Sequence, residues 1–143
     1  MIERDEGRRY SAYPDPLTHA APWTIGVGHT GPEVHQGLIW NDDQIDFALE
    51  LDVDDATQAC MDHFTWFSQL NDARQAVLIS MMFQMGPSRV LAFKTTLSMI
   101  ACGNFAAASQ SMLDSVWAHQ TPLRCARLAM QMKSGVWENE ELQ

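Results

Sequence analysis

The sequence has few basic residues, few cysteines and no long apolar run. Only three of its 143 residues are cysteines, and Cys60, Cys102 and Cys125 are too far apart to form a C-x-x-C pair. An odd number of widely spaced thiols predicts neither a disulfide framework nor a zinc site, so we expect ordinary buried or half-buried side chains. No apolar stretch approaches the roughly 20 residues that a membrane-spanning helix needs. These absences indicate a globular chain with no stable membrane association.

Basic residues are outnumbered by acidic residues, 9 against 18, which gives a net charge of −9. The imbalance is local, because residues 31–73 contain ten acids and no Lys or Arg, whereas residues 74–143 contain six bases and four acids. An acidic surface repels nucleic acid and anionic lipid, so we expect neither as a partner. The simplest interpretation of the acidic segment is the solvent-exposed face of a helix.

The N-terminal third predicts a small lobe that contains β structure. Residues 2–9 predict a short helix that closes near Gly7, and three prolines between residues 11 and 23 indicate a loop. Residues 24–29 predict a strand whose alternating glycines permit a tight bend or the close approach of a ligand or another backbone. Residues 37–40 can pair back as a second short strand.

Helices are predicted for the rest of the chain. A long helix is expected to begin at Asn41 or Asp42, where a polar cap and acidic residues in the first turn are favourable. We expect one face of this helix to be apolar and the opposite face to consist of Asp and Glu. Further helices are expected over 73–85, 97–102, 105–117 and from Pro122 to Gly135, the last with Thr121 as its N-cap. The apolar positions of the long helix recur every three or four residues: Ile45, Leu49, Val53, Ala56 and Cys60.

This pattern predicts an α+β fold in one domain. Residues 1–40 would form the N-terminal lobe, residues 41–68 a connecting helix, and residues 69–143 a C-terminal helical lobe. The helix over 73–85 is apolar around most of its circumference, so we expect it at the centre of the helical lobe.

Two carboxylates and a hydroxyl in the N-terminal lobe are candidate catalytic groups. Glu6 ends the first helix, Asp15 lies in a proline-flanked turn, and Thr24 begins the glycine-rich strand. Glycoside hydrolysis needs one protonated carboxyl to donate to the leaving oxygen and one ionised carboxylate to drive the attack. A Glu6 side chain shielded from water would suit the acid, and an Asp15 carboxylate beside a hydroxyl would hold a water molecule. Acids are also common in turns, so the spacing alone does not decide.

Several ordered motifs strengthen this interpretation. The residues Glu6-Gly7, Tyr13-Pro14-Asp15 and T-I-G-V-G-H-T over 24–30 resemble the E-G, Y-x-D and T-I-G-x-G-H-T signature of phage-type lysozymes, glycoside hydrolase family 24. Later blocks resemble the same family in the same order and extend the resemblance over essentially the whole chain. They cover residues 74–86, 93–97, 115–127 and 135–137.

The resemblance implies a lysozyme-like fold and a muramidase. The bond cleaved would be the β-1,4 linkage between N-acetylmuramic acid and N-acetylglucosamine in peptidoglycan, with Glu6 as general acid. Asp15, helped by Thr24, would orient or activate water, giving net inversion. Trp117 is interpreted as a packing residue or an aromatic edge of the sugar site. Residues matching substrate-lining positions of the family are Thr30, Phe83, Gln84, Thr96 and Ser111.

The resemblance also implies partners and a location. We expect a monomer that acts on peptidoglycan glycan strands without a cofactor and causes bacterial lysis. The first nine residues lack the apolar region of a secretory signal, so we expect the protein to remain in the host cytoplasm until a separate holin-type protein admits it to the periplasmic wall. Two alternatives stay open: a lytic transglycosylase, and a non-enzymatic wall-binding or virion structural module.

The histidines are a second point of interest in the N-terminal lobe. His29 and His35 lie six residues apart among acids, but no third ligand has suitable spacing, so no metal is expected. We predict instead that His29 pairs with Asp52 on the long helix and that this pair raises the His29 pKa.

The chain departs from the family in two respects that bear on activity. The segment between His29 and the long helix is short, so the N-terminal lobe is small. Many relatives are basic, whereas this chain is acidic and should be repelled by an anionic wall. We therefore expect added salt to improve lysis by screening like charges, measured as the clearing rate of cell walls at rising ionic strength. A steady fall in rate from low to moderate salt would contradict this.

Overall fold

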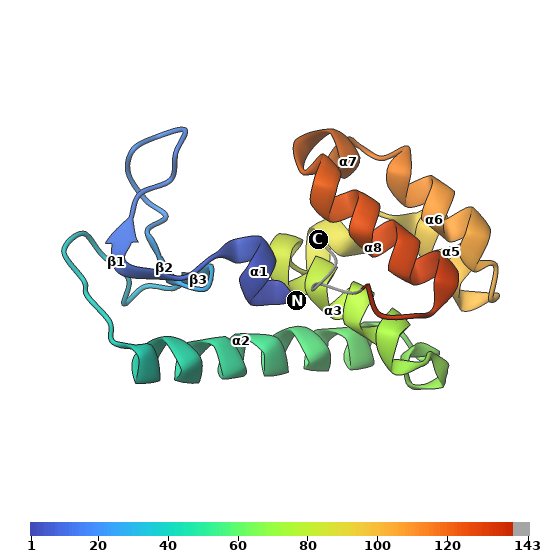
Figure 1. Ribbon diagram of the computed structural model, residues 1–143, viewed down its shortest axis with the longest axis horizontal. Helices are drawn as coiled ribbons and strands as arrows, with labels where there is room; N and C mark the ends of the chain where they lie inside the picture. The colour runs from blue at the N-terminus through green and yellow to red at the C-terminus, as the bar shows by residue number, and fades with distance from the viewer. Residues whose placement is uncertain (139–143) are drawn as a thin grey trace. The chain divides into compact units, whose positions relative to one another are not determined.

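The computed structural model describes residues 1–138 as a set of helices with one small sheet (Figure 1). The chain forms two compact units, residues 1–55 and residues 56–143, and the division falls within the long helix α2 (Asp42–His63). The α+β architecture expected from the sequence is confirmed. None of the helices within residues 1–138 is long and apolar enough to cross a membrane. The lobe limits predicted at residues 40 and 68 stay a prediction.

The first unit holds a three-stranded antiparallel sheet in the order β1-β2-β3. The first helix ends at Glu6 because Gly7 turns the chain with φ 75°. The segment beyond it forms a strand, so the prediction of helix to residue 9 and loop from residue 11 is wrong there. The single strand expected over 24–29 is instead two strands joined by a turn. The elements are α1 (Ile2–Glu6), β1 (Arg9–Tyr13), β2 (Thr24–Gly26) and β3 (His29–Thr30).

The sheet register places the candidate residues of the first unit. Tyr13 is the cross-strand partner of Thr24, and Thr24 is in turn the partner of Thr30. Residues 37–40 do not form a strand on β2. Ile39 makes one isolated bridge to Ser11, so this segment pairs with β1.

Helix α2 begins with a reciprocal cap. The side-chain oxygen of Asn41 accepts from Gln44 N, and the side-chain oxygen of Gln44 accepts from Asn41 N, each at 2.9 Å. This arrangement satisfies two donors that a helix start leaves open. The predicted apolar stripe is buried or half-buried from Ile45 to Cys60. The opposite face is not wholly acidic, because Phe47 and Leu51 lie there 66% and 48% exposed.

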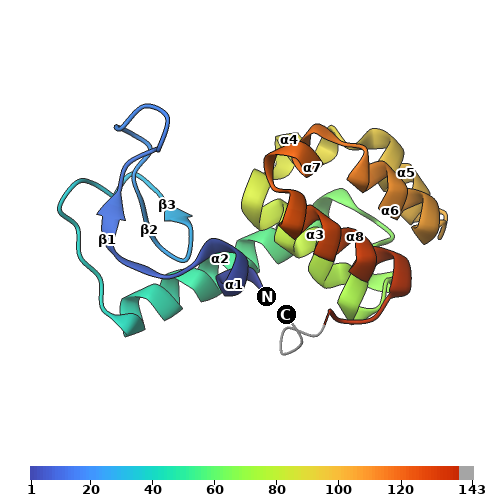
Figure 2. The same cartoon turned by 45° about the horizontal axis from the view of Figure 1, so that its top comes forward.

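The second unit is helical, and the position of α3 at the centre of the helical lobe stays a prediction. Half of that helix is buried, and α8 packs along it (Figure 2). Asn71 caps α3 by accepting from Arg74 N at 3.0 Å. The elements are η1 (Phe67–Gln69), α3 (Asp72–Met85), α4 (Pro87–Leu91), α5 (Lys94–Ala101), α6 (Phe105–Leu113), α7 (Val116–Gln120) and α8 (Pro122–Ser134).

Two helix boundaries in the second unit differ from the sequence prediction. The helix expected over 105–117 is broken, because the Ser115 side chain accepts from Ala118 N and starts α7. Thr121 precedes α8 but does not cap it with its side chain. The Thr121 hydroxyl donates to Trp117 O instead, at 3.4 Å. No helix was predicted at α4, although Pro87 occupies a position at its start that favours proline.

The start of α3 is tied to the end of α8 by side chains. Arg74 donates to the carbonyl oxygens of Met132 at 2.8 Å and Lys133 at 3.0 Å. Asn71 donates to Gly135 O at 2.8 Å. These bonds satisfy carbonyls that the last turn of a helix leaves without partners. Gly135 has φ 69°, and a Cβ there would lie 2.7 Å from Arg74 Cζ, so this position requires glycine.

The three cysteines have different environments. Cys60 and Cys125 are buried, and burial raises the pKa of Cys60 to about 12 and that of Cys125 to about 11. These two thiols are therefore protonated and inert at neutral pH. Cys102 is exposed at the end of α5, so the expectation of a buried or half-buried thiol is wrong for it.

Candidate active site

The Glu6 carboxyl packs against the turn between β2 and β3. Glu6 is the last residue of α1 and is half-buried. Gly28 lies in the turn with φ 68°, and a Cβ at this position would be 3.0 Å from Glu6 Oε2 and 3.2 Å from its Cδ. Gly28 thus combines a backbone conformation that favours glycine with an approach that leaves no room for a side chain. The group that approaches Gly28 closely is the Glu6 carboxyl, a side chain, whereas the sequence suggested a ligand or another backbone.

Tyr13 joins Glu6 to Thr24. Tyr13 and Thr24 are partners across β1 and β2, and their side chains are hydrogen-bonded. Burial and then the nearby negative charge of Glu6 raise the Tyr13 pKa, against the opposing effects of Arg9 and Thr24. The guanidinium of Arg9 lies 4.6 Å from the centre of the Tyr13 ring. Glu6 at the end of α1 and Tyr13 and Thr24 on the sheet therefore form one group, and Tyr13 is a member to which sequence reasoning assigned no role.

Asp15 follows two residues after Tyr13, in the loop that leads from β1 to β2. Its backbone N–H donates to Ala20 O at 3.0 Å, and its carbonyl accepts from His19 N at 2.8 Å. Its carboxylate accepts from Thr18 N at 3.2 Å. These bonds fold the loop around Asp15, and the half-buried carboxylate is fixed by its own turn. The chain thus supplies a second carboxylate from a different segment than Glu6.

Arg8 fixes the junction between α1 and β1. Its guanidinium contacts Glu3 at 2.7 Å, Asp42 at 2.9 Å and Asp46 at 2.5 Å, and Tyr10 donates to the same Asp42 oxygen at 2.8 Å. Hydrogen bonds to Asp46 and then Glu3 raise the Arg8 pKa further above its usual range. The three carboxylates come from α1 and from the first turns of α2. Because Arg8 is two residues after Glu6, these contacts hold the end of α1 in place. No sequence pattern predicted this cluster.

His29 pairs with Asp52, which confirms the prediction from the sequence. Its Nδ1 lies 2.6 Å from an Asp52 carboxylate oxygen, and its Nε2 lies 2.6 Å from Glu33, a partner that was not foreseen. Burial opposes the charged ring, but the hydrogen bonds to Glu33 and Asp52 outweigh it and raise the His29 pKa. The His29–Glu33 spacing of four residues was the available signal. The Trp40 ring lies 5.3 Å from the imidazole.

This pair predicts a pH-dependent stability. A raised His29 pKa adds stability that is fully present below about 6.5 and fades as the pH rises through the raised value. The hydrogen bond from His29 lowers the Glu33 pKa, which adds stability above about 4.5 that is lost as the pH falls through the lowered value. Both contributions are complete between these values. We expect Asp52→Asn to lower the free energy of unfolding by about 1.5–3 kcal/mol between these two pH values, and by less at alkaline pH.

Thermal unfolding of both proteins across the pH range measures this difference, with Asp54→Asn as the control on the same helix. An NMR titration of the His29 ring gives the pKa directly. An unshifted His29, or an Asp52→Asn cost that does not change with pH, would contradict the prediction.

The remaining candidate residues fall into separate places. Thr30 lies exposed in β3 of the first unit. Phe83 and Gln84 lie half-buried in the last turn of α3, where Gln84 Oε1 accepts from Trp117 Nε1 at 3.0 Å. Trp117 is 2% exposed, with its ring edge-on to Phe93 at 6.1 Å, so packing is its main role.

Thr96 and Ser111 are paired with each other. Their hydroxyl oxygens are 2.7 Å apart, from α5 and α6, and Thr96 is only 2% exposed. A buried Thr96 can orient the Ser111 hydroxyl but has little surface of its own to offer a ligand. Within residues 1–138 no three His, Cys, Asp or Glu side chains are grouped to hold a metal ion.

Comparison with known proteins assigns this chain to a family. The model of the family described as phage lysozyme matches residues 3–129. Two similar proteins are the probable T4-type lysozymes 1 and 2 of Dictyostelium discoideum, 27% and 24% identical, each alignment covering 94% of this chain and 92% of the relative. The pre-baseplate central spike protein Gp5 of Enterobacteria phage T4 is 29% identical over 97% of this chain, which spans 28% of that protein. The chain belongs to the phage lysozyme family and is a lysozyme-like peptidoglycan hydrolase.

Proposed function

We propose that this protein hydrolyses the β-1,4 bond between N-acetylmuramic acid and N-acetylglucosamine. The observation that carries the proposal is the Glu6 carboxyl held against Gly28, in one group with Tyr13 and Thr24. A carboxyl packed on a backbone turn is oriented before substrate arrives, and the Asp15 loop supplies the second carboxylate that glycoside hydrolysis requires.

The proposed reaction is a single displacement at the anomeric carbon. Protonated Glu6 donates its proton to the glycosidic oxygen, which leaves as the hydroxyl of the departing sugar. Asp15 accepts a proton from a water molecule that Thr24 helps to hold, and the water oxygen bonds to the anomeric carbon on the opposite face. The bond to the leaving oxygen breaks as the new bond forms, so the product has inverted configuration.

The biological setting follows from this activity. We propose that the protein acts as a monomer on the periplasmic wall of its bacterial host, stays in the host cytoplasm until lysis, and depends on a separate holin-type protein for release. The names of the Dictyostelium relatives support a lysozyme. The similarity to part of a phage baseplate spike protein supports a second role, in which such a domain serves within a virion.

Product analysis tests the proposed reaction. Purified peptidoglycan is digested and the muropeptides are measured by mass spectrometry. Hydrolysis leaves reducing muramic acid ends that carry one added water, whereas a lytic transglycosylase leaves anhydro ends without it. Proton NMR of the first products then gives the anomeric configuration, and an initial excess of the α anomer supports inversion. Anhydro ends would overturn the hydrolase mechanism, and unaltered glycan strands would leave only a wall-binding or virion role.

A further inference from the structure

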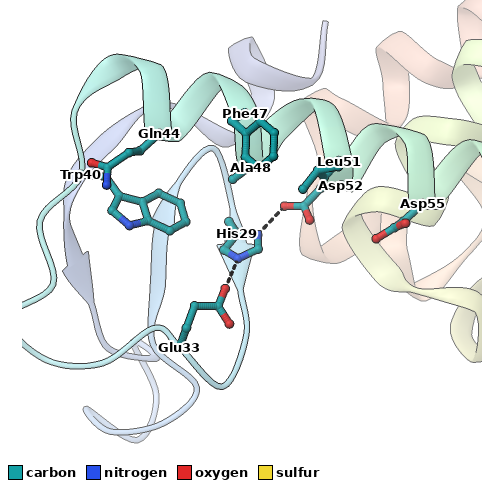
Figure 3. A pocket seen from close by; sticks show the side chains of 9 residues that line it. All are labelled: His29, Glu33, Trp40, Gln44, Phe47, Ala48, Leu51, Asp52 and Asp55. Atoms are coloured by element: carbon teal, nitrogen blue, oxygen red, sulfur yellow. Dashed lines mark hydrogen bonds and ion pairs between the residues drawn. The ribbon is translucent and has the colours of Figure 1, made fainter.

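A pocket on the first unit lies apart from the proposed catalytic group. It has a volume of about 390 Å³, within the range of ligand-binding pockets. Figure 3 shows that one side comes from α2 and the other from β3 and the segment that follows it. Glu6, Asp15 and Thr24 are not among its lining residues. The pocket is lined by His29, Glu33, Trp40, Gln44, Phe47, Ala48, Leu51, Asp52 and Asp55.

One part of the pocket is an apolar surface open to solvent. Phe47 and Leu51 lie one helical turn apart on α2, and 66% and 48% of their surfaces are exposed. Trp40 adds a half-buried indole beside His29. A helix in a globular unit normally turns its large apolar side chains inward, and α2 already does so with Ile45. The outward Phe47 and Leu51 therefore form a second apolar surface that the unit itself does not cover.

The rest of the pocket is negatively charged. Glu33, Asp52 and Asp55 line it, and no Lys or Arg does so. His29 is the single base among the lining residues, and it is already paired with Glu33 and Asp52. Even with His29 protonated, three carboxylates face one positive charge. The lining thus complements a group that carries positive charge next to apolar surface.

We propose that this pocket binds a basic segment of a partner protein, which inserts a Lys or Arg side chain beside an apolar one. The charged head would lie toward the carboxylates, and the apolar neighbour would cover Phe47 and Leu51. A segment fits better than a free small amine, because one side chain can cover Phe47 and Leu51 while its neighbour reaches the carboxylates. Residues 31–73, which include every lining residue except His29, contain no Lys or Arg. The proposal does not depend on the hydrolase activity.

Peptide binding tests the proposal. The probe is a six-residue peptide that alternates lysine and leucine, titrated into the full-length protein while backbone amide shifts are followed by NMR. We expect saturable shifts centred on residues 47–55. Phe47→Ala and Asp55→Asn should each weaken binding at least fivefold. Asp54→Asn is the matched control, because it removes the same charge from the exposed neighbouring position outside the pocket, and it should change the dissociation constant less than twofold.

Three comparison ligands make the outcome decisive. Replacing leucine by serine, or lysine by glutamate, in the peptide should abolish saturation. The small cation phenethylammonium should bind much more weakly than the peptide. Equal weakening by Asp54→Asn and Asp55→Asn would show non-specific charge attraction and overturn the proposal. Binding of phenethylammonium as tight as that of the peptide, or the absence of shifts near residue 51, would overturn it as well.

Discussion

Glu6→Gln is expected to reduce the clearing of cell walls by about 100- to 10,000-fold, the range typical for the loss of a general acid. Glutamine has nearly the same shape as glutamate but no proton to donate to the glycosidic oxygen. It can still occupy the space against Gly28, so the fold should be retained. Turbidity of Gram-negative cells with exposed walls measures the rate, and thermal unfolding measures the stability.

Glu50→Gln is a suitable control for this variant, because Glu50 is an exposed residue of α2. It makes the same change in charge and should retain near-wild-type clearing. Asp15→Asn should lower the rate to a similar extent as Glu6→Gln while preserving the unfolding temperature. A Glu6→Gln protein that clears walls within a few-fold of the wild-type rate would exclude Glu6 as the proton donor.

Gly28→Ala is the second prediction with a large expected effect. The added methyl would lie 3.0 Å from Glu6 Oε2, so the carboxyl must move away from the turn. A contact of this length requires a shift of a few tenths of an ångström. Because a displacement of about 1 Å in a catalytic group can cost about 100-fold in rate, the loss expected here is smaller. The left-handed backbone conformation adds a destabilisation of roughly 1–2 kcal/mol. We therefore expect kcat to fall severalfold, by less than about 100-fold, while the protein remains folded.

Gly37→Ala separates these two effects. Gly37 lies in the same unit with φ 90°, and nothing lies within 4 Å of its Cβ position. Its alanine variant should carry a similar backbone strain but keep full activity. Equal losses of activity in the two variants would mean that strain alone, and not the contact with Glu6, lowers the rate.

Much of the helical part of this fold is predictable from the sequence, because residues that start or end a helix lie directly beside its ends. Asn71 caps the start of α3 and Gly86 follows its last residue, close to the limits of 73 and 85 that the sequence predicts. The predicted helix boundaries are wrong where a side chain can form either of two local hydrogen bonds. Ser115 accepts from Ala118 N and divides the helix expected over 105–117, whereas Thr121 donates to Trp117 O and does not cap α8. Sequence patterns do not rank such alternatives.

The sheet was less predictable, since its pairing is not local. Residues 9–13 carry no strong strand pattern. They form β1 because Tyr13 pairs with Thr24 across the sheet and Ser11 forms a bridge with Ile39. The family motif placed Glu6, Asp15 and Thr24 in the candidate site. It did not reveal the Arg8 contacts with Asp42 and Asp46, which join residues 34 and 38 positions apart.

The bonds from Asn71 and Arg74 to the end of α8 also constrain when the second unit can be completed. They join residues 64 and 58 positions apart, so the chain between them forms a long loop whose closure has a large entropic cost. A polypeptide leaves the ribosome from its N-terminus, and these bonds cannot form before the end of α8 has emerged. Until then α3 lacks its contacts with α8, and apolar surface exposed in this way promotes aggregation of a nascent chain.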